Sequence, residues 1–391
     1  MRGHAMQTPR TGDEESLRAT VRRWGEDELR PRVATMDRDA LMPRELIDEL
    51  FALGVMGVEI PGRYGGAGGT FVMSSLVIAE LARVDPAVAV CVDVQNVLVN
   101  SALLRWGNPE QQARHLPRLA GDTVGAYALS EPEAGSDAFS LRTRAKRDGK
   151  DYLLTGEKVW ITNAREAGVF VVFATVAPEH GAHGVTAFLV PGAAPGLTVG
   201  PNQDKLCLRA SSSCRVRLDD VHVSQDDRLG EEGEGYDIAI DTLNLGRIGI
   251  AAQMVGLAAG ALEESVAYAK RRHQFGQPIA EFQGVQLPLA QVATELEAAR
   301  LLMYDTARLA DSGRHVPELL TRAAMAKQFC AQVAERAASR AVETFGGNGF
   351  STSHPAEKRY RDAKIGQIYE GTSNILLRTI AWNVLQEAPR C

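Results

Sequence analysis

Cysteine is scarce in this 391-residue sequence, which contains five cysteines and no Cys-x-x-Cys pair. A disulfide scaffold or a cysteine zinc site needs paired cysteines, so neither is expected, and a reducing compartment fits the composition better. The eight histidines show no His-x-x-x-His spacing, so the sequence predicts no metal site. The cysteines are Cys91, Cys207, Cys214, Cys330 and Cys391.

Motifs for phosphate binding and nucleophilic catalysis are also missing. No Gly-x-Gly-x-x-Gly follows a predicted strand, and no Gly-x-x-x-x-Gly-Lys-Ser/Thr occurs, which argues against a Rossmann dinucleotide site and a P-loop. The Gly-x-Ser-x-Gly elbow of α/β-hydrolases is absent as well. A catalytic acid in this chain must therefore work without a metal or an evident nucleophile.

Excess positive charge and long apolar runs are lacking too. The net charge of −6 gives no basic surface for nucleic acid and no polybasic membrane patch. No apolar run is expected to approach the length of a membrane span. The opening stretch, MRGHAMQTPRTGDEES, has no apolar segment of the kind found in signal peptides. These absences predict a cytoplasmic protein without nucleic-acid or membrane partners.

The residues that are present suit a large folded chain, because 45% are hydrophobic and 24% are charged. The pattern is helical in the first third, as in RELIDELFALG, where Leu46, Ile47, Leu50 and Phe51 recur at helical spacing before Gly54. Short β-rich runs follow, and a second helical zone closes the chain. We therefore predict an α+β multidomain protein with an N-terminal helical domain (1–124), a central β domain (125–237) and a C-terminal helical domain (238–391).

One short stretch near the C-terminus, IYEGTSNI, holds a single carboxylate, Glu370, between an aromatic ring and a glycine. Read alone, it is a helix start, since Gly371, Thr372 and Ser373 are turn and cap residues and an apolar helix follows. An acid near a helix start also suits the helix dipole. The rest of the sequence has to decide whether Glu370 does more.

Five other stretches stand out in the sequence, and each has a plain structural interpretation. YALSEPEAGSD can be a capped surface loop, and KVWITNA can be a strand with a core tryptophan at Trp160. LNLGRIGIAAQ is a helix that carries Arg247 among small residues. RRHQFGQPI can be a solvated helix end, and ETFGGNGF can be a glycine turn. Taken singly, no stretch decides between its structural interpretation and a role in ligand binding.

In this order and at these separations, however, the stretches resemble the acyl-CoA dehydrogenase family over essentially the whole chain. The short/branched-chain members are the most similar, through LVIAELARVDPAVAV, EFQGVQLPLAQVATELEAARLL and RDAKIGQIYEGTSNI. The resemblance implies an N-terminal helical domain, a central β-barrel-like domain and a C-terminal four-helix bundle. It also implies bound FAD, an acyl-CoA thioester substrate, a homotetramer built as a dimer of dimers, and electron-transfer flavoprotein as the expected electron acceptor.

The resemblance assigns FAD contacts to three groups of positions. One group matches the flavin end of the cofactor: Tyr127, Leu129, Ser130, Gly135, Ser136, Trp160, Ile161 and Thr162. A second group matches positions that reach the adenine half of the FAD of a neighbouring subunit: Arg272, Phe275, Gln283, Glu343, Gly346 and Gly347. Thr372 and Asn374 match the last flavin contacts.

The same resemblance assigns the substrate side to Ser136, Tyr236, Asn244, Gly246 and Arg247, and it makes Glu370 the catalytic base. In the family, the base takes the α-proton of the thioester, and its own backbone N–H helps to hold the thioester oxygen. Some branches carry the base on the earlier helix, just before the arginine of the Gly-Arg pair. This sequence has Gly246 there, which leaves Glu370 as the candidate.

Four departures and three alternatives qualify this expectation. Ser130 stands where many relatives have threonine and keeps the hydroxyl, and Glu343 replaces a common glutamine, which can change affinity for the adenosine or pyrophosphate. Cys207 replaces a usual glycine and Ala182 an aromatic residue of close relatives, which leaves pantetheine or partner recognition open. The alternatives are a dehydrogenase acting on a carrier-protein-bound acyl group, an acyl-CoA oxidase, and a helical scaffold that has lost its flavin. The residues that would line an acyl pocket are ordinary apolar ones, so acyl length and branching stay undetermined.

Overall fold

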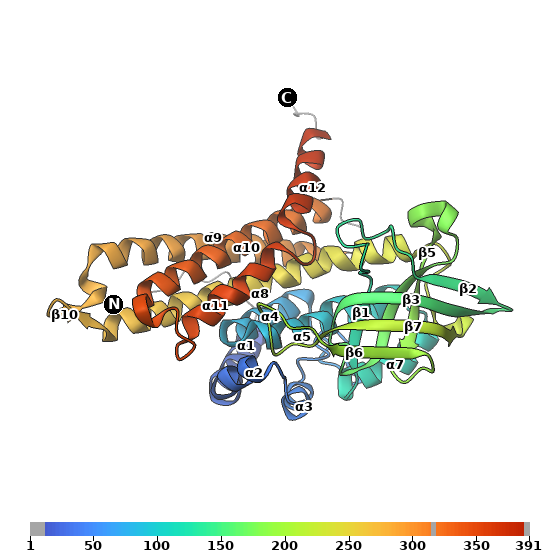
Figure 1. The fold of residues 1–391 in the computed structure, drawn as a ribbon, viewed down its shortest axis with the longest axis horizontal. Coiled ribbons are helices and arrows are strands. Elements are labelled where there is room, and N and C mark those ends of the chain that lie inside the picture. Colours follow the sequence, from blue (N-terminus) through green and yellow to red (C-terminus); the bar gives the residue numbers. More distant parts are fainter. Residues whose placement is uncertain (1–11, 314–317, 387–391) are drawn as a thin grey trace.

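The computed structural model describes residues 12–313 and 318–386, so Cys391 and most of the opening stretch lie outside the described residues. Figure 1 shows helices at the N-terminal end of the chain, a sheet beside them and a layer of long helices formed by the C-terminal part. The predicted order of helices, strands and helices is confirmed. The positions of the predicted domain boundaries remain predictions.

The N-terminal part is helical, as its apolar spacing predicts. Leu46, Ile47, Leu50 and Phe51 are buried on one face of a short helix, and Gly54 follows its end with a φ of 77°. The helices of this part are α1 (Gly12–Trp24), α2 (Val33–Asp39), α3 (Arg44–Ala52), α4 (Phe71–Val84), α5 (Pro86–Asp93), α6 (Ser101–Trp106) and α7 (Pro109–Gly121). A π-helical segment, η4 (Val94–Asn100), joins α5 to α6.

The central part is one mixed sheet of eight strands. Their order across the sheet is β6-β7-β3-β2-β4-β5-β8, and β1 pairs in parallel with β4. The strands are β1 (Val124–Ala128), β2 (Arg144–Asp148), β3 (Asp151–Thr162), β4 (Ala167–Thr175), β5 (Val185–Pro191), β6 (Leu197–Asn202), β7 (Ser213–Val223) and β8 (Arg228–Leu229). Side chains alternate along β7, since Val216 and Leu218 are buried and Arg215 and Arg217 are exposed.

The C-terminal part consists of long helices around α8 (Gly235–Arg271), which packs against α4, α9 and α10. One apolar face of α9 is buried at Val292, Leu296, Ala299 and Met303. The remaining elements are the hairpin strands β9 (His273–Gln274) and β10 (Gln277–Pro278), then α9 (Gln283–Asp311), α10 (Leu319–Phe345), α11 (Pro355–Ala363) and α12 (Ser373–Gln386). In Figure 1, α12 projects away from the other helices.

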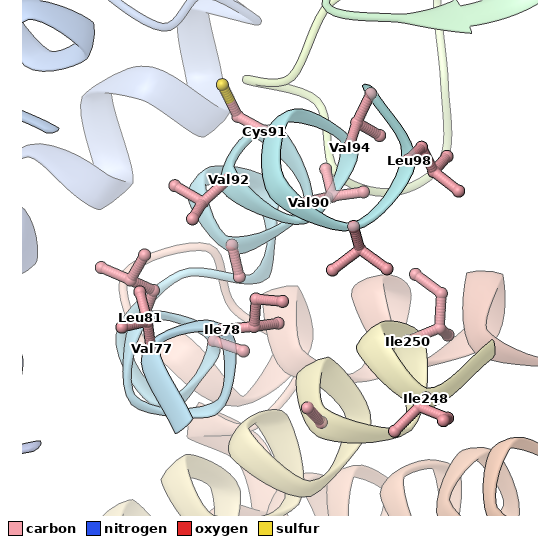
Figure 2. Packing of buried hydrophobic residues seen from close by; sticks show 14 of the residues in the cluster. Val77, Ile78, Leu81, Val90, Cys91, Val92, Val94, Leu98, Ile248 and Ile250 are labelled. Atoms are coloured by element: carbon pink, nitrogen blue, oxygen red, sulfur yellow. The ribbon is translucent and has the colours of Figure 1, made fainter. Parts of the chain in front are cut away.

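The main core lies where α4, the α5–η4 helix and α8 meet. Figure 2 shows Val90, Val94 and Leu98 of the α5–η4 helix beside Ile248 and Ile250 of α8. Burial of this many aliphatic side chains fixes how α8 lies against the N-terminal part. The position of α8 matters because it carries most of the predicted substrate-side residues.

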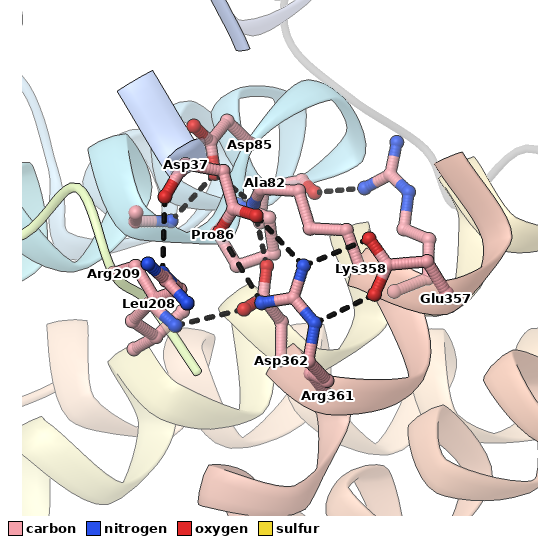
Figure 3. A network of polar contacts seen from close by, with 12 residues as sticks. Asp37, Ala82, Asp85, Pro86, Leu208, Arg209, Glu357, Lys358, Arg361 and Asp362 are labelled. Carbon is pink, nitrogen blue, oxygen red and sulfur yellow. Dashed lines mark hydrogen bonds and ion pairs between the residues drawn. The ribbon is translucent and has the colours of Figure 1, made fainter. Parts of the chain in front are cut away.

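A buried polar network fastens the C-terminal helices to the other two parts of the chain (Figure 3). Lys358 of α11 donates to Asp85 at 2.8 Å and to Asp362 at 2.6 Å. Asp362 also accepts the backbone N–H of Leu208, at 2.7 Å, from the loop between β6 and β7. Arg361 binds Asp37 of α2 at 2.7 Å. The paired charges therefore connect the N-terminal helices, the β part and α11.

The expectation that no apolar run approaches the length of a membrane span is wrong, when the runs are judged by length and composition alone. Two helical stretches, Pro86–Trp106 and Gly235–Arg271, are long and apolar enough to cross a membrane. In each, however, 94% of the most apolar window is buried inside the protein. They are apolar because they form the core that Figure 2 shows.

Candidate active site

Glu370 lies in a sharp turn between the 3-10 segment η9 (Lys364–Gln367) and α12. Glu370 has a φ of 51° and Gly371 a φ of 94°, so two successive residues adopt the left-handed conformation. A non-glycine residue in this region marks a strained backbone, which is often found at functional sites. Thr372 then accepts the N–H of Ile375 at 3.4 Å and begins the helix. The helix-start interpretation therefore holds, and Glu370 stands just outside the helix.

The Glu370 carboxylate points at the one-residue gap that Gly246 leaves on α8. A Cβ atom at position 246 would lie 2.7 Å from Oε2 of Glu370 and 3.0 Å from Cδ2 of Leu98. Oε2 is inaccessible to solvent and has no hydrogen-bond partner among the described residues. Gly246 thus makes room for the carboxylate, and one oxygen is left without a partner.

Burial sets the charge state of this group. It raises the pKa of Glu370 to about 7, and the positive charges of Arg247 and Lys327 offset part of the rise. Burial also lowers the pKa of Lys327 to about 7, an effect that the Glu370 charge opposes. Lys327 donates to the carbonyl oxygen of Gly371 at 2.7 Å, so it also holds the turn. A carboxylate with a pKa near neutrality is suited to take up a proton and release it again.

The predicted substrate-side residues gather at the N-terminal half of α8. Arg247 donates to Asn244 at 2.9 Å, and its Nε atom has no partner among the described residues. Tyr236, in the first turn of α8, packs against Phe139, with ring centroids 4.5 Å apart. Phe139 belongs to the loop that carries exposed Ser136. The structure thus places the loop of Ser136 beside the start of the helix that carries the other four.

The first group of predicted flavin positions also comes together, through two strands. Val159 of β3 donates its N–H to the carbonyl of Ser130 at 3.0 Å, which joins the segment after β1 to the strand that carries Trp160, Ile161 and Thr162. Tyr127 of β1 shares a 2.8 Å hydrogen bond with Thr242, which ties this group to α8.

Trp160 decides between the two interpretations of its strand. Its side chain is 63% exposed and its φ is 61°, so it is no core tryptophan. Ile161 beside it is buried, and Gly135 in the facing loop is exposed. A large aromatic ring held outward on a strained backbone is the kind of surface on which a flavin ring can stack. The residues present therefore fit the cofactor.

The second group lies elsewhere, at the far end of α8. Arg272 comes 25 residues after Arg247, which corresponds to about 37 Å along a helix. Phe275 is 96% exposed, and the other members of the group are exposed as well: Arg272, Gln283, Glu343, Gly346 and Gly347. A cavity of about 420 Å³ opens beside Arg272 and is lined by the stacked rings of Tyr268 and Phe345. Within one chain, the structure does not bring the two groups together. Thr372 and Asn374 stay with Glu370 at the start of α12.

Three residues near these sites were missed from the sequence. Lys327 is fully buried on α10, and its spacing from Ala324 and Cys330 could have placed it on the buried face. Lys158 donates to Glu131 at 2.7 Å and to the carbonyl of Leu129 at 3.1 Å, which supports the Ser130 segment. Asp93 is a buried acid on α5 that no motif marked. In the described part of the chain, no cluster of three or more potential metal ligands occurs.

Comparison with protein families matches nearly the whole chain. The acyl-CoA dehydrogenase N-terminal domain matches residues 11–123, the middle domain matches residues 126–221 and the C-terminal domain matches residues 233–385. The order of the three matches agrees with the helical, β and helical parts of the fold.

Individual relatives give the same result. The chain is 50% identical over 376 residues to a probable short/branched chain specific acyl-CoA dehydrogenase of Dictyostelium discoideum, covering 96% of this chain and 90% of that one. It is 45% identical over 374 residues to the mitochondrial short/branched chain specific acyl-CoA dehydrogenase of Rattus norvegicus, covering 96% and 86%. The structure of butyryl-CoA dehydrogenase from Megasphaera elsdenii superposes with a TM-score of 0.94 at 37% identity, covering 97% of this chain and 100% of that one.

Proposed function

The chain belongs to the acyl-CoA dehydrogenase family, and from this premise we propose that Glu370 is the base that starts its reaction. The protein is an FAD-dependent oxidoreductase that desaturates short or branched-chain acyl-CoA thioesters. FAD, when bound, would supply the acceptor for the hydride from Cβ, so the chain itself has to remove the proton from Cα and to hold the thioester. The carboxylate of Glu370 does the first, and its backbone N–H contributes to the second.

The observation that carries this proposal is the unpartnered Oε2 atom of Glu370 with its pKa of about 7. A base of this pKa is about half ionised at neutral pH, so it can take up the α-proton and still hold it after the transfer. The Gly246 gap keeps the carboxylate against α8, close enough to Arg247 for its positive charge to lower the pKa of Glu370. The α-carbon of the thioester would therefore sit between Glu370 and the flavin-facing residues.

The backbone of Glu370 supports a second role. Its amide N–H donates to no atom of the described residues, although the residue is partly buried. We assign this N–H to the thioester oxygen, on which negative charge grows as the α-proton leaves. The left-handed turn at Glu370 makes the N–H and the carboxylate available from one residue.

We also propose that FAD is shared between subunits of a homotetramer. The two groups of predicted cofactor residues lie at opposite ends of α8, and the second group is exposed. Exposed apolar side chains on α12, namely Leu377, Trp382, Val384 and Leu385, supply further surface for a neighbouring subunit. Arg272 of one subunit would then bind the FAD whose flavin lies at Trp160 of another.

Electron-transfer flavoprotein is the electron acceptor that we propose, and the cytoplasm is the proposed location. The alternatives predicted from the sequence, a carrier-protein dehydrogenase and an oxidase, have no specific support in the site. Two measurements on the wild-type enzyme distinguish the proposed dehydrogenase from these two alternatives. The wild-type enzyme should reduce its flavin faster with acyl-CoA than with the same acyl group on a carrier protein, and its reduced flavin should react slowly with oxygen.

The experiment that tests the base is anaerobic reduction of the bound flavin by straight and branched acyl-CoAs in wild type and Glu370→Gln. Glutamine is nearly isosteric and keeps the backbone N–H, so FAD and acyl-CoA should still bind. The reduction rate should fall by about 10²- to 10⁴-fold, as expected when a positioned base is lost. Wild-type reduction rates in the glutamine variant would show that Glu370 is not the base.

A further inference from the structure

A second carboxyl group lies beside Glu370 and is not part of the mechanism described above. Asp93 ends α5, just before the π-helical segment η4, and is 0% exposed. Neither of its carboxylate oxygens has a hydrogen-bond partner among the described residues. Buried carboxyl groups are nearly always paired, because an unpaired one costs on the order of 1–3 kcal/mol or more. The fully buried carboxyl group of Asp93 therefore needs a physical reason for having no partner.

The Asp93 side chain fills a gap that a glycine leaves on α8, as the Glu370 side chain does at Gly246. A Cβ atom at Gly249 would lie 1.9 Å from Oδ1 of Asp93, just as one at Gly246 would lie 2.7 Å from Oε2 of Glu370. Positions 246 and 249 are three residues apart, so they share one face of α8 with about 5–6 Å between them. Two unpartnered carboxyl groups therefore stand next to each other along this face.

The surroundings of Asp93 do not favour a charge. Val97, four residues after Asp93, is fully buried, and its Cγ2 atom would lie 3.4 Å from the same Cβ position at Gly249. Burial raises the pKa of Asp93 well above its usual value, and the negative charge of Glu370 raises it further. Both cations of the site, Arg247 and Lys327, act on Glu370. Of the two acids, Glu370 is therefore the one that ionises near neutral pH.

Tyr369 completes the row of side chains on this face. Its hydroxyl donates to Gln253 of α8, four residues after Gly249, and Gln253 donates to the carbonyl of Pro86 at 2.7 Å. Burial keeps the pKa of Tyr369 well above its usual value. With its hydroxyl proton engaged by Gln253, Tyr369 is no donor for either carboxyl group.

We propose that Asp93 is a positioning residue for Glu370: it remains a neutral carboxylic acid, and its O–H donates to the unpartnered oxygen of the Glu370 carboxylate. The pair then carries one proton and one negative charge. A small turn of either side chain is the movement that brings the two groups into contact, since each fills one of two adjacent gaps on α8. A hydrogen bond from a neutral acid to a carboxylate is among the stronger ones. This inference rests on the proposed role of Glu370.

The first test measures whether Asp93 holds a proton in the folded holoenzyme, and it needs no substrate. A carboxyl group with a raised pKa stabilises the folded chain most below its unfolded pKa, and this stabilisation is lost as the pH rises toward the folded pKa. Asp93→Asn cannot titrate. The melting temperature of the asparagine variant minus that of wild type should therefore increase steadily from pH 5 to pH 8. A difference that does not change with pH would overturn the neutral state of Asp93.

The second test reads the effect on Glu370 through the pH dependence of kcat/KM for flavin reduction. Asp93→Leu has the same branching but no donor, so the acidic limb should move up by about one pH unit, the size expected for one lost hydrogen bond to a charge. Asp93→Asn supplies an N–H donor and should move the limb back toward the wild-type position. The proposal would be contradicted if the acidic limb lay at the same pH in wild type and the leucine variant. An acidic limb at lower pH in the asparagine variant than in wild type would also contradict it.

The two measurements also separate this inference from the proposed function. If no acyl-CoA reduces the wild-type flavin, the proposed function fails, and the melting series still reports the state of Asp93. If wild type is active and the limbs of all three proteins coincide, the function stands and the coupling between the two acids does not.

Discussion

At the scale of single residues, the site depends on how few charges surround Glu370. Arg247 and Lys327 are both buried, and both lower the pKa of Glu370 against the larger effect of burial. The result, a pKa of about 7, lies close to the pH at which a base of this kind works best. Each of these groups can be changed singly, so each effect can be measured.

The pH dependence of the wild-type enzyme follows from this value. Glu370 accepts a proton only when ionised, so kcat/KM should fall about tenfold per pH unit below about pH 7 and level off above it. The same raised pKa means that Glu370 favours folding most below its unfolded pKa of about 4.3, and that this contribution is lost as the pH rises to about 7. Steady-state rates and melting temperatures over one pH series measure both. Activity that rises on acidification would contradict the assignment.

Lys327 should matter in two ways, through its charge and through its bond to Gly371. Lys327→Met removes a positive charge next to Glu370, so the acidic limb should shift to higher pH. The Gly371 carbonyl loses its donor, so the melting temperature should fall as well. Lys364→Met is the matched control, because Lys364 is exposed and pairs with Glu335. A limb that moves equally in both variants would rule out a specific role for Lys327.

At the scale of elements, α8 is built to receive side chains from other parts of the chain. Its Gly246 and Gly249 positions are gaps that Glu370 and Asp93 fill, and Gly256 lies so close to α4 that a Cβ would meet the Ala79 carbonyl oxygen at 2.1 Å. Glycine inside a helix costs about 1 kcal/mol relative to alanine. The glycines of α8 therefore reflect close approach rather than helix stability.

Gly246→Ala tests this interpretation of α8. The added Cβ would overlap Oε2 of Glu370, so the carboxylate has to move, and flavin reduction should slow by at least about tenfold. The melting temperature should change little, because alanine is the better helix former. Gly121→Ala, at the end of α7, adds a Cβ with no atom within 4 Å and should leave the rate unchanged. An unaltered rate in Gly246→Ala would mean that the contact with Glu370 is not needed.

At the scale of the whole molecule, the length of α8 separates the two halves of the predicted cofactor site. Trp160 and Arg272 are both exposed, and each belongs to a group of predicted FAD contacts that is incomplete within one chain. In the proposed arrangement, a second subunit would complete the site, so the two groups could bind one ligand although they lie far apart. FAD retention would then depend on assembly.

Complementation between subunits gives a direct test. Trp160→Ala and Arg272→Ala should each lose most of the bound FAD when purified alone. When the two variants are co-expressed, a mixed pair contains one site with both defects and one site with none, so up to half of the sites should regain FAD and activity. Absorbance of the bound flavin in the purified mixed assembly measures the result. Failure to recover any flavin in mixed assemblies would place both residues at the same site of one chain.

The sequence by itself determined the order of helical and β parts and the absence of nucleotide-fold and hydrolase motifs, and the resemblance of its short stretches to a known family made Glu370 the candidate base. These features depend on local spacing and on short stretches of residues, which a sequence displays directly. Only the tertiary structure brought Gly246 against Glu370, Lys327 against Gly371 and Asp93 against Gly249. Each contact joins segments distant in the chain, and a buried lysine or aspartate has no local signature. The charge on Glu370 depends on burial and on these neighbours, so it is a property of the folded molecule.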